Sequence, residues 1–266
     1  MLNEDTAGPD AILTERRGDV LVITLNRPER LNALSPAIGN RLSGMLQELG
    51  GARAVLLRGN GPAFCSGTDL KRQPDADDDP GAMSYRVLVG SYNPLMLAMI
   101  DLEVPIVTAV RGAAAGIGCS IALAADFCLA SEEAYFLQAF VNIGFVPDSG
   151  ASWLLPRLTS RARALELMML GERLHAARAL EWGMIHNVVP DERLEEDSFA
   201  LAARLAAGPT KTLGLIRRQT ARALEGSFAE ALSLEAENQR LARRTKDAAE
   251  GVSAFREKRG PVFEGH

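Results

Sequence analysis

The chain has 266 residues, of which 47% are hydrophobic and 24% charged, and its formal net charge is −5. This composition is that of a globular protein of one or two domains, and it excludes a disordered chain, a collagen-like repeat and a disulfide-stapled miniprotein. The negative charge gives no general attraction to nucleic acid or anionic lipid, so an anionic ligand needs a local basic cluster. Three cysteines without CxxC spacing argue against a disulfide framework or a zinc site.

The N-terminal residues Met1 to Asp5 lack the apolar core of a signal peptide. The longest apolar stretch, residues 112–125, is shorter than the roughly 18 residues that a membrane-spanning helix needs. We therefore expect a soluble, cytoplasmic protein without membrane or nucleic-acid partners.

Short β-branched runs predict buried strands at residues 20–25, 54–57 and 105–110. Ser35-Pro36 predicts the start of a helix that Gly50-Gly51 ends, because serine caps and proline suits the first helical position. A second helix is predicted from the apolar residues of segment 85–99. The acidic segment 74–81 between them predicts an exposed loop, since its carboxylates lack the spacing of an EF-hand calcium loop.

Strands alternate with helices to about residue 190, which predicts an α/β class. A helix is then expected at residues 194–205, followed by helix over 211–257 with breaks near Gly226 and Gly251. We therefore predict an α/β core at residues 1–207 and a helical C-terminal module at residues 208–266.

Several common motifs are incomplete. Gly116-Ile117-Gly118 lacks the third glycine of a dinucleotide fingerprint, and the sequence has neither a GxSxG elbow nor a P-loop. The basic residues between Arg240 and Lys246 are interleaved with acidic ones nearby, which favours a solvated helix face over a nucleic-acid patch.

Two glycine-rich turns, residues 63–70 and 112–119, each follow a predicted buried strand. Small residues at the exit of a strand let the backbone approach a ligand or another backbone closely. If the two turns face each other, their N–H groups can converge on one anionic oxygen. Tight packing of the turns, without a ligand, is an equally good interpretation from the residues alone.

Six blocks occur in a fixed order. They are Asn26-Arg27-Pro28-x-x-Leu31-Asn32-Ala33-Leu34, residues 58–70 ending Cys65-Ser66-Gly67-Thr68-Asp69-Leu70, Ala115-Gly116-Ile117-Gly118-Cys119, Ile143-Gly144-Phe145-Val146-Pro147-Asp148-Ser149-Gly150, residues 179–189, and residues 250–259. Together they resemble the crotonase superfamily, the enoyl-CoA hydratases and isomerases, over about residues 12–263. The resemblance implies a spiral of ββα units with a helical C-terminal trimerisation module, and a homotrimer or homohexamer.

The resemblance also implies the site residues. The oxyanion hole of the family falls on the backbone N–H groups of Thr68 and Ile117, which would stabilise a thioester enolate. The positions that meet CoA, in part across subunits, are Arg27, Cys65, Ser66, Leu70, Lys71, Phe255 and Lys258. An acyl-CoA substrate is implied, with no metal and no cofactor beyond the coenzyme A that the substrate carries.

The sequence departs from the hydratase pattern at two positions. Hydratases of the family place glutamates where this chain has Ser120 and Phe140. Asp148, eight residues after Phe140, instead matches the aspartate of some dienoyl-CoA isomerases and of the ring-epoxide isomerase of phenylacetate degradation. One carboxylate can remove a proton from one carbon and return it to another, with apolar neighbours such as Phe145, Val146 and Trp153 raising its pKa.

We therefore expect an enoyl-CoA isomerase that uses Asp148 as proton shuttle. An enoyl-CoA hydratase and a non-catalytic acyl-CoA-binding protein are the alternatives. A purely structural role for Asp148, capping the helix that follows it, is also open.

Overall fold

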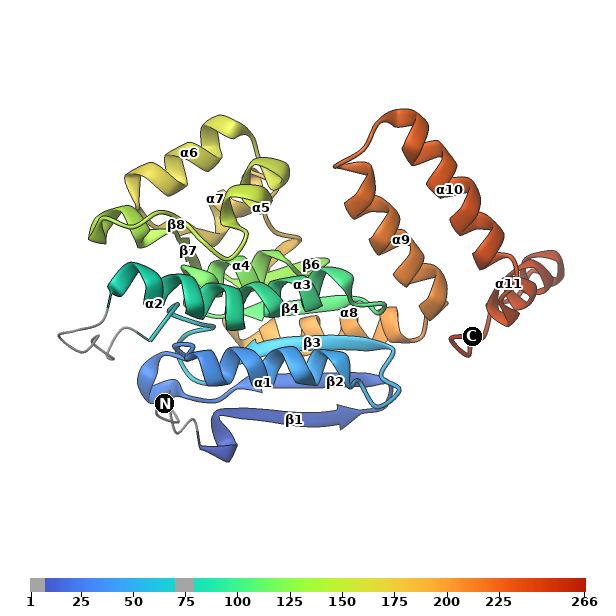
Figure 1. The fold of residues 1–266 in the computed structure, drawn as a ribbon. Helices are drawn as coiled ribbons and strands as arrows, with labels where there is room; N and C mark the ends of the chain where they lie inside the picture. The colour runs from blue at the N-terminus through green and yellow to red at the C-terminus, as the bar shows by residue number, and fades with distance from the viewer. Residues whose placement is uncertain (1–7, 70–78) are drawn as a thin grey trace.

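The computed structural model describes residues 8–69 and 79–266. A six-stranded sheet has the strand order β1-β2-β3-β4-β6-β9, and a three-stranded sheet has the order β5-β7-β8 (Figure 1). The strands are β1 (Ile12–Arg17), β2 (Val20–Leu25), β3 (Ala54–Gly59), β4 (Ile106–Val110), β5 (Ala113–Ala115), β6 (Phe127–Ser131), β7 (Tyr135–Leu137), β8 (Leu174–His175) and β9 (Asn187–Val189). From β2 to β9 the large sheet is parallel.

Both faces of the large sheet carry buried side chains. Successive side chains of a strand point to opposite sides, so one strand contributes to two apolar clusters. Ile23, Val55 and Leu57 belong to the larger apolar cluster, which the helices α1 (Pro36–Gln47) and α3 (Asn93–Asp101) complete. Val22 and Leu56 belong to a second cluster, which α8 (Leu194–Ala206) covers from the other side. The continuous β-branched runs of the sequence are explained by this double coverage.

The remaining helices connect the strands or follow them. They are α2 (Pro80–Val87), α4 (Ile117–Leu123), α5 (Ala151–Leu158), α6 (Arg161–Leu170), α7 (Ala176–Glu181), α9 (Thr210–Ala223), α10 (Phe228–Ala242) and α11 (Lys246–Glu257), with short 3₁₀ turns at Pro9–Ala11, Pro28–Arg30, Ala139–Ile143 and Asp191–Arg193. As predicted, Ser35 caps α1: its hydroxyl accepts the Ile38 N–H at 3.4 Å.

The N-terminal strand β1 was not predicted from the sequence. It pairs antiparallel with β2, with Ile12 opposite Leu25. Most of its residues are exposed, so it carries no apolar run. An edge strand of this kind is recognisable only by its partner.

The segment after residue 78 is helical, which corrects the expected loop at 74–81 where it is described. The Asp79 carboxylate caps α2, accepting the Gly81 N–H at 2.8 Å. A π-helical stretch, Leu88–Tyr92, joins α2 to α3. This stretch shifts the register of the predicted apolar face, so that Tyr92 is buried whereas Tyr85 is 68% exposed.

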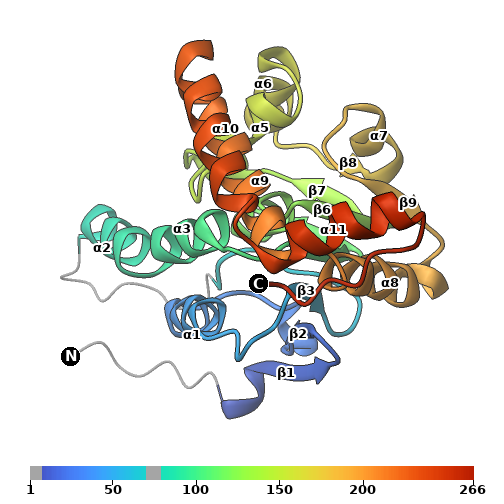
Figure 2. The same ribbon diagram turned by 90° about the vertical axis from the view of Figure 1, so that its right-hand side faces the viewer.

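The C-terminal helices α9, α10 and α11 extend from the side of the core (Figure 2). The expected boundary at residue 207 falls between α8 and α9. The predicted break near Gly226 separates α9 from α10, but Gly251 lies inside α11, so the second expected break is wrong. The chain instead breaks at Thr245, whose hydroxyl caps α11 by accepting the Ala248 N–H at 3.0 Å.

Candidate active site

The two glycine-rich turns lie side by side. The Cys65 N–H donates to the Ala113 carbonyl at 3.0 Å, and the Ala115 N–H donates to the Cys65 carbonyl at 2.9 Å. This pairing adds an isolated parallel bridge between Cys65 and Ala114 to the sheets. The first turn therefore runs along the strand that leads into the second.

Gly67 and Gly116 bring the tips of the turns together. Their φ angles are +101° and +53°, a region that favours glycine. A side chain at Gly67 would place its Cβ 3.1 Å from the Ala115 carbonyl oxygen, and one at Gly116 would lie 3.8 Å from the Cα of Gly67. The turns face each other, which is the arrangement that convergence of their amides requires.

Peptide planarity sets the direction of the two amides that follow these glycines. The Gly67 carbonyl accepts the Leu34 N–H at 2.8 Å, so the Thr68 N–H points away from Leu34. The Gly116 carbonyl accepts the N–H groups of the first turn of α4, so the Ile117 N–H points away from the helix. Neither amide donates a hydrogen bond within residues 8–69 and 79–266. Both are free to bind an acceptor supplied by a ligand.

Asp148 lies between the 3₁₀ turn Ala139–Ile143 and α5. Its Oδ1 accepts the Ser149 hydroxyl at 2.8 Å. Burial raises the pKa of Asp148 above its usual value, and the hydrogen bond from Ser149 opposes that shift. Gly150 is the residue that precedes α5, without a side-chain cap, so Asp148 does not cap this helix. Ser149 has φ of +51°, a strained conformation at a buried non-glycine residue.

Tyr92 lies beside the first turn, and its pKa responds both to this turn and to Asp148. Burial raises the pKa of its phenol most, a hydrogen bond with the Thr68 side chain lowers it, and the nearby charge of Asp148 raises it. The tyrosine is therefore within electrostatic range of both. On the other side, Phe140 packs over the second turn, with its Cζ 3.6 Å from a Cβ built at Gly116.

The two hydratase positions hold no acid. Ser120 is 1% exposed, and its hydroxyl has no hydrogen-bond partner among the described residues. Phe140 is half-buried, whereas Phe145 and Val146 are 56% and 80% exposed. These last two side chains therefore shield Asp148 less than their apolar character predicts. Trp153 is half-buried, and the Arg157 guanidinium lies 4.1 Å from the centre of its ring.

The residues expected to bind CoA are placed unequally. Ser66 is half-buried in the first turn, and its carbonyl accepts no hydrogen bond from the described part of the chain. Cys65 has both backbone groups bonded to the second turn, and burial raises the pKa of its thiol to about 12. The Cys65 N–H is therefore used within the chain, whereas its carbonyl oxygen, which can accept two hydrogen bonds, accepts one there. Leu70 and Lys71 lie outside the described residues.

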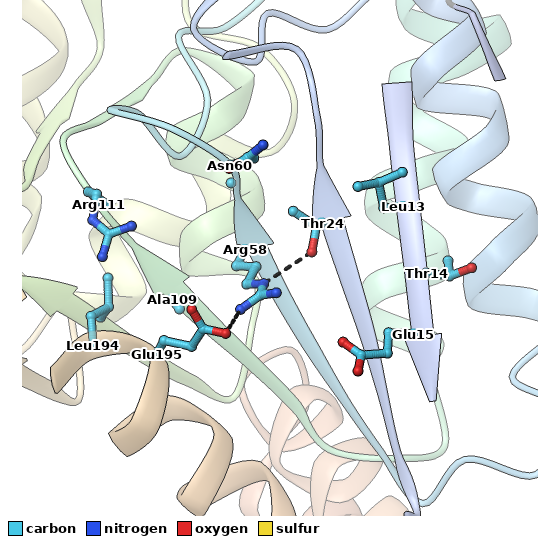
Figure 3. A pocket seen from close by; sticks show the side chains of 11 residues that line it. Leu13, Thr14, Glu15, Thr24, Arg58, Asn60, Ala109, Arg111, Leu194 and Glu195 are labelled. Carbon is cyan, nitrogen blue, oxygen red and sulfur yellow. Dashed lines mark hydrogen bonds and ion pairs between the residues drawn. The ribbon is translucent and has the colours of Figure 1, made fainter. Parts of the chain in front are cut away.

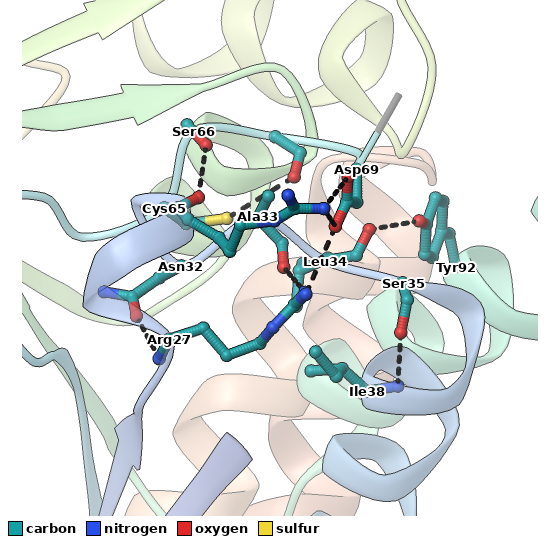
Figure 4. Close-up of polar contacts among 12 residues, drawn as sticks. Arg27, Asn32, Ala33, Leu34, Ser35, Ile38, Cys65, Ser66, Asp69 and Tyr92 are labelled. Atoms are coloured by element: carbon teal, nitrogen blue, oxygen red, sulfur yellow. Dashed lines mark hydrogen bonds and ion pairs between the residues drawn. The ribbon is translucent and has the colours of Figure 1, made fainter. Parts of the chain in front are cut away.

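Arg27 is held inside its loop. Its guanidinium donates to the Ala33 carbonyl at 2.9 Å and lies 3.3 Å from the Asp69 carboxylate (Figure 4). Its side chain is 19% exposed. Arg27 therefore orders the loop in this structure, with little of the guanidinium left for a phosphate.

Phe255 and Lys258 are exposed on α11 and just after it. The structure does not bring them to the turns of the same chain, because α11 lies at the end of the molecule opposite α2 (Figures 1 and 2).

Sequence reasoning missed Asn32 as an organiser of the site. Asn32 is 2% exposed, its Oδ1 accepts the Arg27 N–H at 2.7 Å, and its Nδ2 donates to the carbonyls of Asn60 and Ala63. It thereby fastens the segment after β2 to the first turn, and Figure 4 shows its bond with Arg27. Asn32 has a φ of +55°, which asparagine adopts more readily than most non-glycine residues. An asparagine in a loop is therefore the sequence signal that could have indicated this position.

A cleft of about 430 Å³ lies on the α8 side of the large sheet (Figure 3). None of Thr68, Ile117 and Asp148 lines it. Its cations are already paired within the chain, Arg58 with Glu195 and Arg111 with Asp191. The cleft is therefore separate from the candidate site.

The chain is similar to known proteins over nearly its whole length. The family model described as enoyl-CoA hydratase/isomerase matches residues 15–266. The chain belongs to this family. It is 41% identical to the 1,2-epoxyphenylacetyl-CoA isomerase of Escherichia coli, over 96% of this chain and 98% of that protein. It is also 41% identical to a probable enoyl-CoA hydratase of Rhodobacter capsulatus, over 92% of this chain and 94% of that protein.

The fold agrees as well. The crystal structure of a putative enoyl-CoA hydratase/isomerase from Mycobacterium abscessus superposes with a TM-score of 0.90 at 34% identity, covering 96% of this chain and all of that one. The protein therefore has the crotonase fold with C-terminal helices, and it is an enzyme of the enoyl-CoA hydratase/isomerase family.

Among the described residues, no helix is long and apolar enough to cross a membrane. Within the same residues, no group of three or more histidine, cysteine, aspartate or glutamate side chains is placed to hold a metal ion.

Proposed function

We propose that this enzyme isomerises acyl-CoA thioesters by moving a proton, with Asp148 as the proton shuttle and the Thr68 and Ile117 amides as the oxyanion hole. The observation that carries the proposal is the combination of two facing turns, whose Thr68 and Ile117 amides donate to no described residue, with a carboxyl of raised pKa at Asp148, whose charge acts on Tyr92 beside the first turn. Ser120 and Phe140 support isomerisation over hydration, because neither can activate a water molecule as a carboxylate does.

The steps follow from these groups. The Asp148 carboxylate removes a proton from a carbon next to the unsaturated system, and the electron pair of that C–H bond moves into the thioester as an enolate. The two N–H groups stabilise the negative charge on the thioester oxygen, each by about 2.7–4 kcal/mol. The protonated Asp148 then returns the proton to another carbon. The raised pKa of Asp148 makes it a stronger base than an ordinary carboxylate.

No metal and no cofactor beyond the CoA of the substrate enters this scheme, because the enolate is stabilised by backbone groups alone. The E. coli relative suggests the substrate class, an aromatic acyl-CoA with an oxidised ring, and with it phenylacetate degradation. The Rhodobacter relative keeps enoyl-CoA hydration as the second candidate.

We also propose that the enzyme assembles as a homotrimer or homohexamer. Apolar side chains of α9, α10 and α11 are exposed in the single chain, Phe228 and Phe255 by more than three quarters. In such an assembly Phe255 and Lys258 could meet the CoA bound by a neighbouring subunit.

The test is the Asp148→Asn variant, assayed for conversion of cis-3-hexenoyl-CoA to the 2-enoyl thioester. We expect kcat to fall by about 10²–10⁴-fold, the range that a general base contributes. Asp197→Asn is the matched control, since it removes a carboxylate paired with Arg193 on α8, which covers the other face of the large sheet. Near-native turnover of Asp148→Asn would refute the assignment.

Two further outcomes separate the alternatives. Formation of 3-hydroxybutyryl-CoA from crotonyl-CoA by the unaltered enzyme would favour the hydratase. Tight CoA binding without exchange of solvent deuterium into a bound thioester would favour a non-catalytic binding protein.

A further inference from the structure

Tyr92 is buried by an irregularity in its helix. It ends the π-helical stretch Leu88–Tyr92, where one extra residue per turn rotates the following side chains. Tyr92 and Ser91 are 1% and 2% exposed as a result. The Tyr92 ring lies against α1 where Gly39 leaves room, since a Cβ there would be 3.2 Å from the ring carbon Cδ1. The packing against α1 therefore fixes the position of the ring.

The hydroxyl of Tyr92 donates to the Leu34 carbonyl at 2.9 Å (Figure 4). The same carbonyl accepts the Asp69 N–H at 2.9 Å, and the Leu34 N–H donates to the Gly67 carbonyl at 2.8 Å. Leu34 therefore holds the chain immediately before and immediately after Thr68. These contacts form the isolated bridge between Leu34 and Thr68.

The bridge determines where the Thr68 amide points. Because the peptide is planar, fixing the Gly67 carbonyl toward Leu34 fixes the Thr68 N–H in the opposite direction, away from Leu34. A hydroxyl that anchors Leu34 therefore limits how far this amide can swing. An ordinary tyrosine hydroxyl is already protonated at neutral pH and can donate, and burial raises the pKa of Tyr92 further.

We propose that Tyr92 is a positioning residue for the oxyanion hole, acting through the Leu34 carbonyl on the orientation of the Thr68 N–H. The proposal rests on the proposed function, because it assigns the Thr68 amide to the thioester oxygen. It adds a residue of the helical layer to a site built otherwise from turns.

The experiment uses the Tyr92→Phe variant of the full chain, which removes the hydroxyl and keeps the ring packed against Gly39. The probe is butyryl-CoA labelled with carbon-13 at the thioester carbonyl, whose stretching frequency is measured by infrared difference spectroscopy when bound. Hydrogen bonds from the oxyanion hole lower this frequency. Turnover of cis-3-hexenoyl-CoA and thermal unfolding are measured on the same samples.

We expect Tyr92→Phe to lose a large part of the frequency shift and to lower kcat by about tenfold with KM nearly unchanged, since misplacing a catalytic group weakens transition-state binding more than substrate binding. Tyr135→Phe is the matched control. Tyr135 lies in β7, its ring packs against the Arg173 guanidinium, and its hydroxyl has no hydrogen bond among the described residues. The variant should keep both the shift and kcat.

The failures are distinguishable. If the unaltered enzyme shows the frequency shift and Tyr92→Phe retains it in full, the positioning role is wrong and the proposed function stands. A lower unfolding temperature with unchanged shift and kcat also overturns the proposal, because Tyr92 would then only stabilise the fold. If the unaltered enzyme shows no shift on binding, the oxyanion hole of the proposed function is itself wrong.

Discussion

The α/β core and the three C-terminal helices differ in what covers their apolar side chains. In the core, strands β2, β3 and β4 are covered on one face by α1 and α3 and on the other by α8. Leu215 of α9 is buried, but several large apolar residues on or next to α9, α10 and α11 are exposed in the single chain: Ile216, Leu224, Phe228, Leu232, Leu241 and Phe255.

The helices are joined to the core through polar groups and close backbone contact. The Arg217 guanidinium lies 2.7 Å from the Asp126 carboxylate and donates to the Met99 carbonyl at 3.0 Å. Gly214 allows α9 to approach Glu103, whose carbonyl oxygen would be 2.3 Å from a Cβ at that position. The sheet of the core therefore buries its apolar side chains within the chain, whereas α9, α10 and α11 leave several of theirs exposed, as the core does around Val146 and Met169. Changes in the core should alter catalysis and changes in the helices should alter assembly.

The largest effect is expected from Gly116→Ala in the second turn. An L side chain is strained at this φ, and relief of that strain would turn the Ile117 N–H away from the substrate oxygen. We expect kcat to fall by about 10²–10³-fold, the effect of losing one oxyanion donor. Steady-state kinetics on cis-3-hexenoyl-CoA measures this loss.

Gly18→Ala is the matched control for this substitution. Gly18 has a similar φ of +59° and open space around it, in the turn between β1 and β2. It shares the positive φ, and Gly18→Ala should leave kcat unchanged. Equal losses in both variants would mean that strain alone, and not the direction of the amide, explains the effect.

An intermediate effect is expected from Phe228→Ser on α10. If this side chain is buried between subunits, its loss should weaken each contact by roughly 1.5–3 kcal/mol, which raises the dissociation constant about tenfold or more. Analytical ultracentrifugation over a range of concentrations measures the change. The unfolding of the core should be unaffected.

Met169→Ser is the control for assembly, because Met169 is 66% exposed on α6, outside the C-terminal helices. It should leave the sedimentation unchanged. If the unaltered protein is monomeric, the C-terminal helices do not serve assembly, and the proposed difference in function between them and the core is wrong.

The smallest effect is expected in the stability of Asp148→Asn. The raised pKa means that the folded protein holds this proton to a higher pH than the unfolded chain. Stability therefore falls as pH rises from the usual carboxyl pKa through the raised one, and charged Asp148 destabilises the fold at neutral pH. Asp148→Asn should raise Tm slightly at pH 7, and the two proteins should converge at acid pH.

Calorimetry at several pH values measures this difference. The activity of the unaltered enzyme should follow the opposite course, rising with pH through the raised pKa as the base loses its proton. A Tm for Asp148→Asn below that of the unaltered protein at pH 7 would show that the carboxylate stabilises the fold.

Much of the fold could be predicted because its signals are local. The strand at Val20–Leu25 and the helix cap at Ser35 were predicted and are observed. Apolar runs and capping side chains act over a few neighbouring residues, so the sequence shows them directly. The two glycine turns were found for the same reason, and their facing arrangement was stated as one of two possibilities. Edge strand β1 was missed because its exposed residues carry no apolar pattern of their own.

In the candidate site, too, some features follow from the sequence and others only from the tertiary structure. The sequence by itself determined the family blocks, the position of Asp148 and the absence of acids at Ser120 and Phe140. Only the tertiary structure decided that the Cys65 backbone is already bonded, that Arg27 is held by Asp69, and that Tyr92 reaches Leu34. The physical reason is distance along the chain: residues 27, 34, 69 and 92 meet through packing of separate elements, and no local pattern records which hydrogen bonds such packing forms.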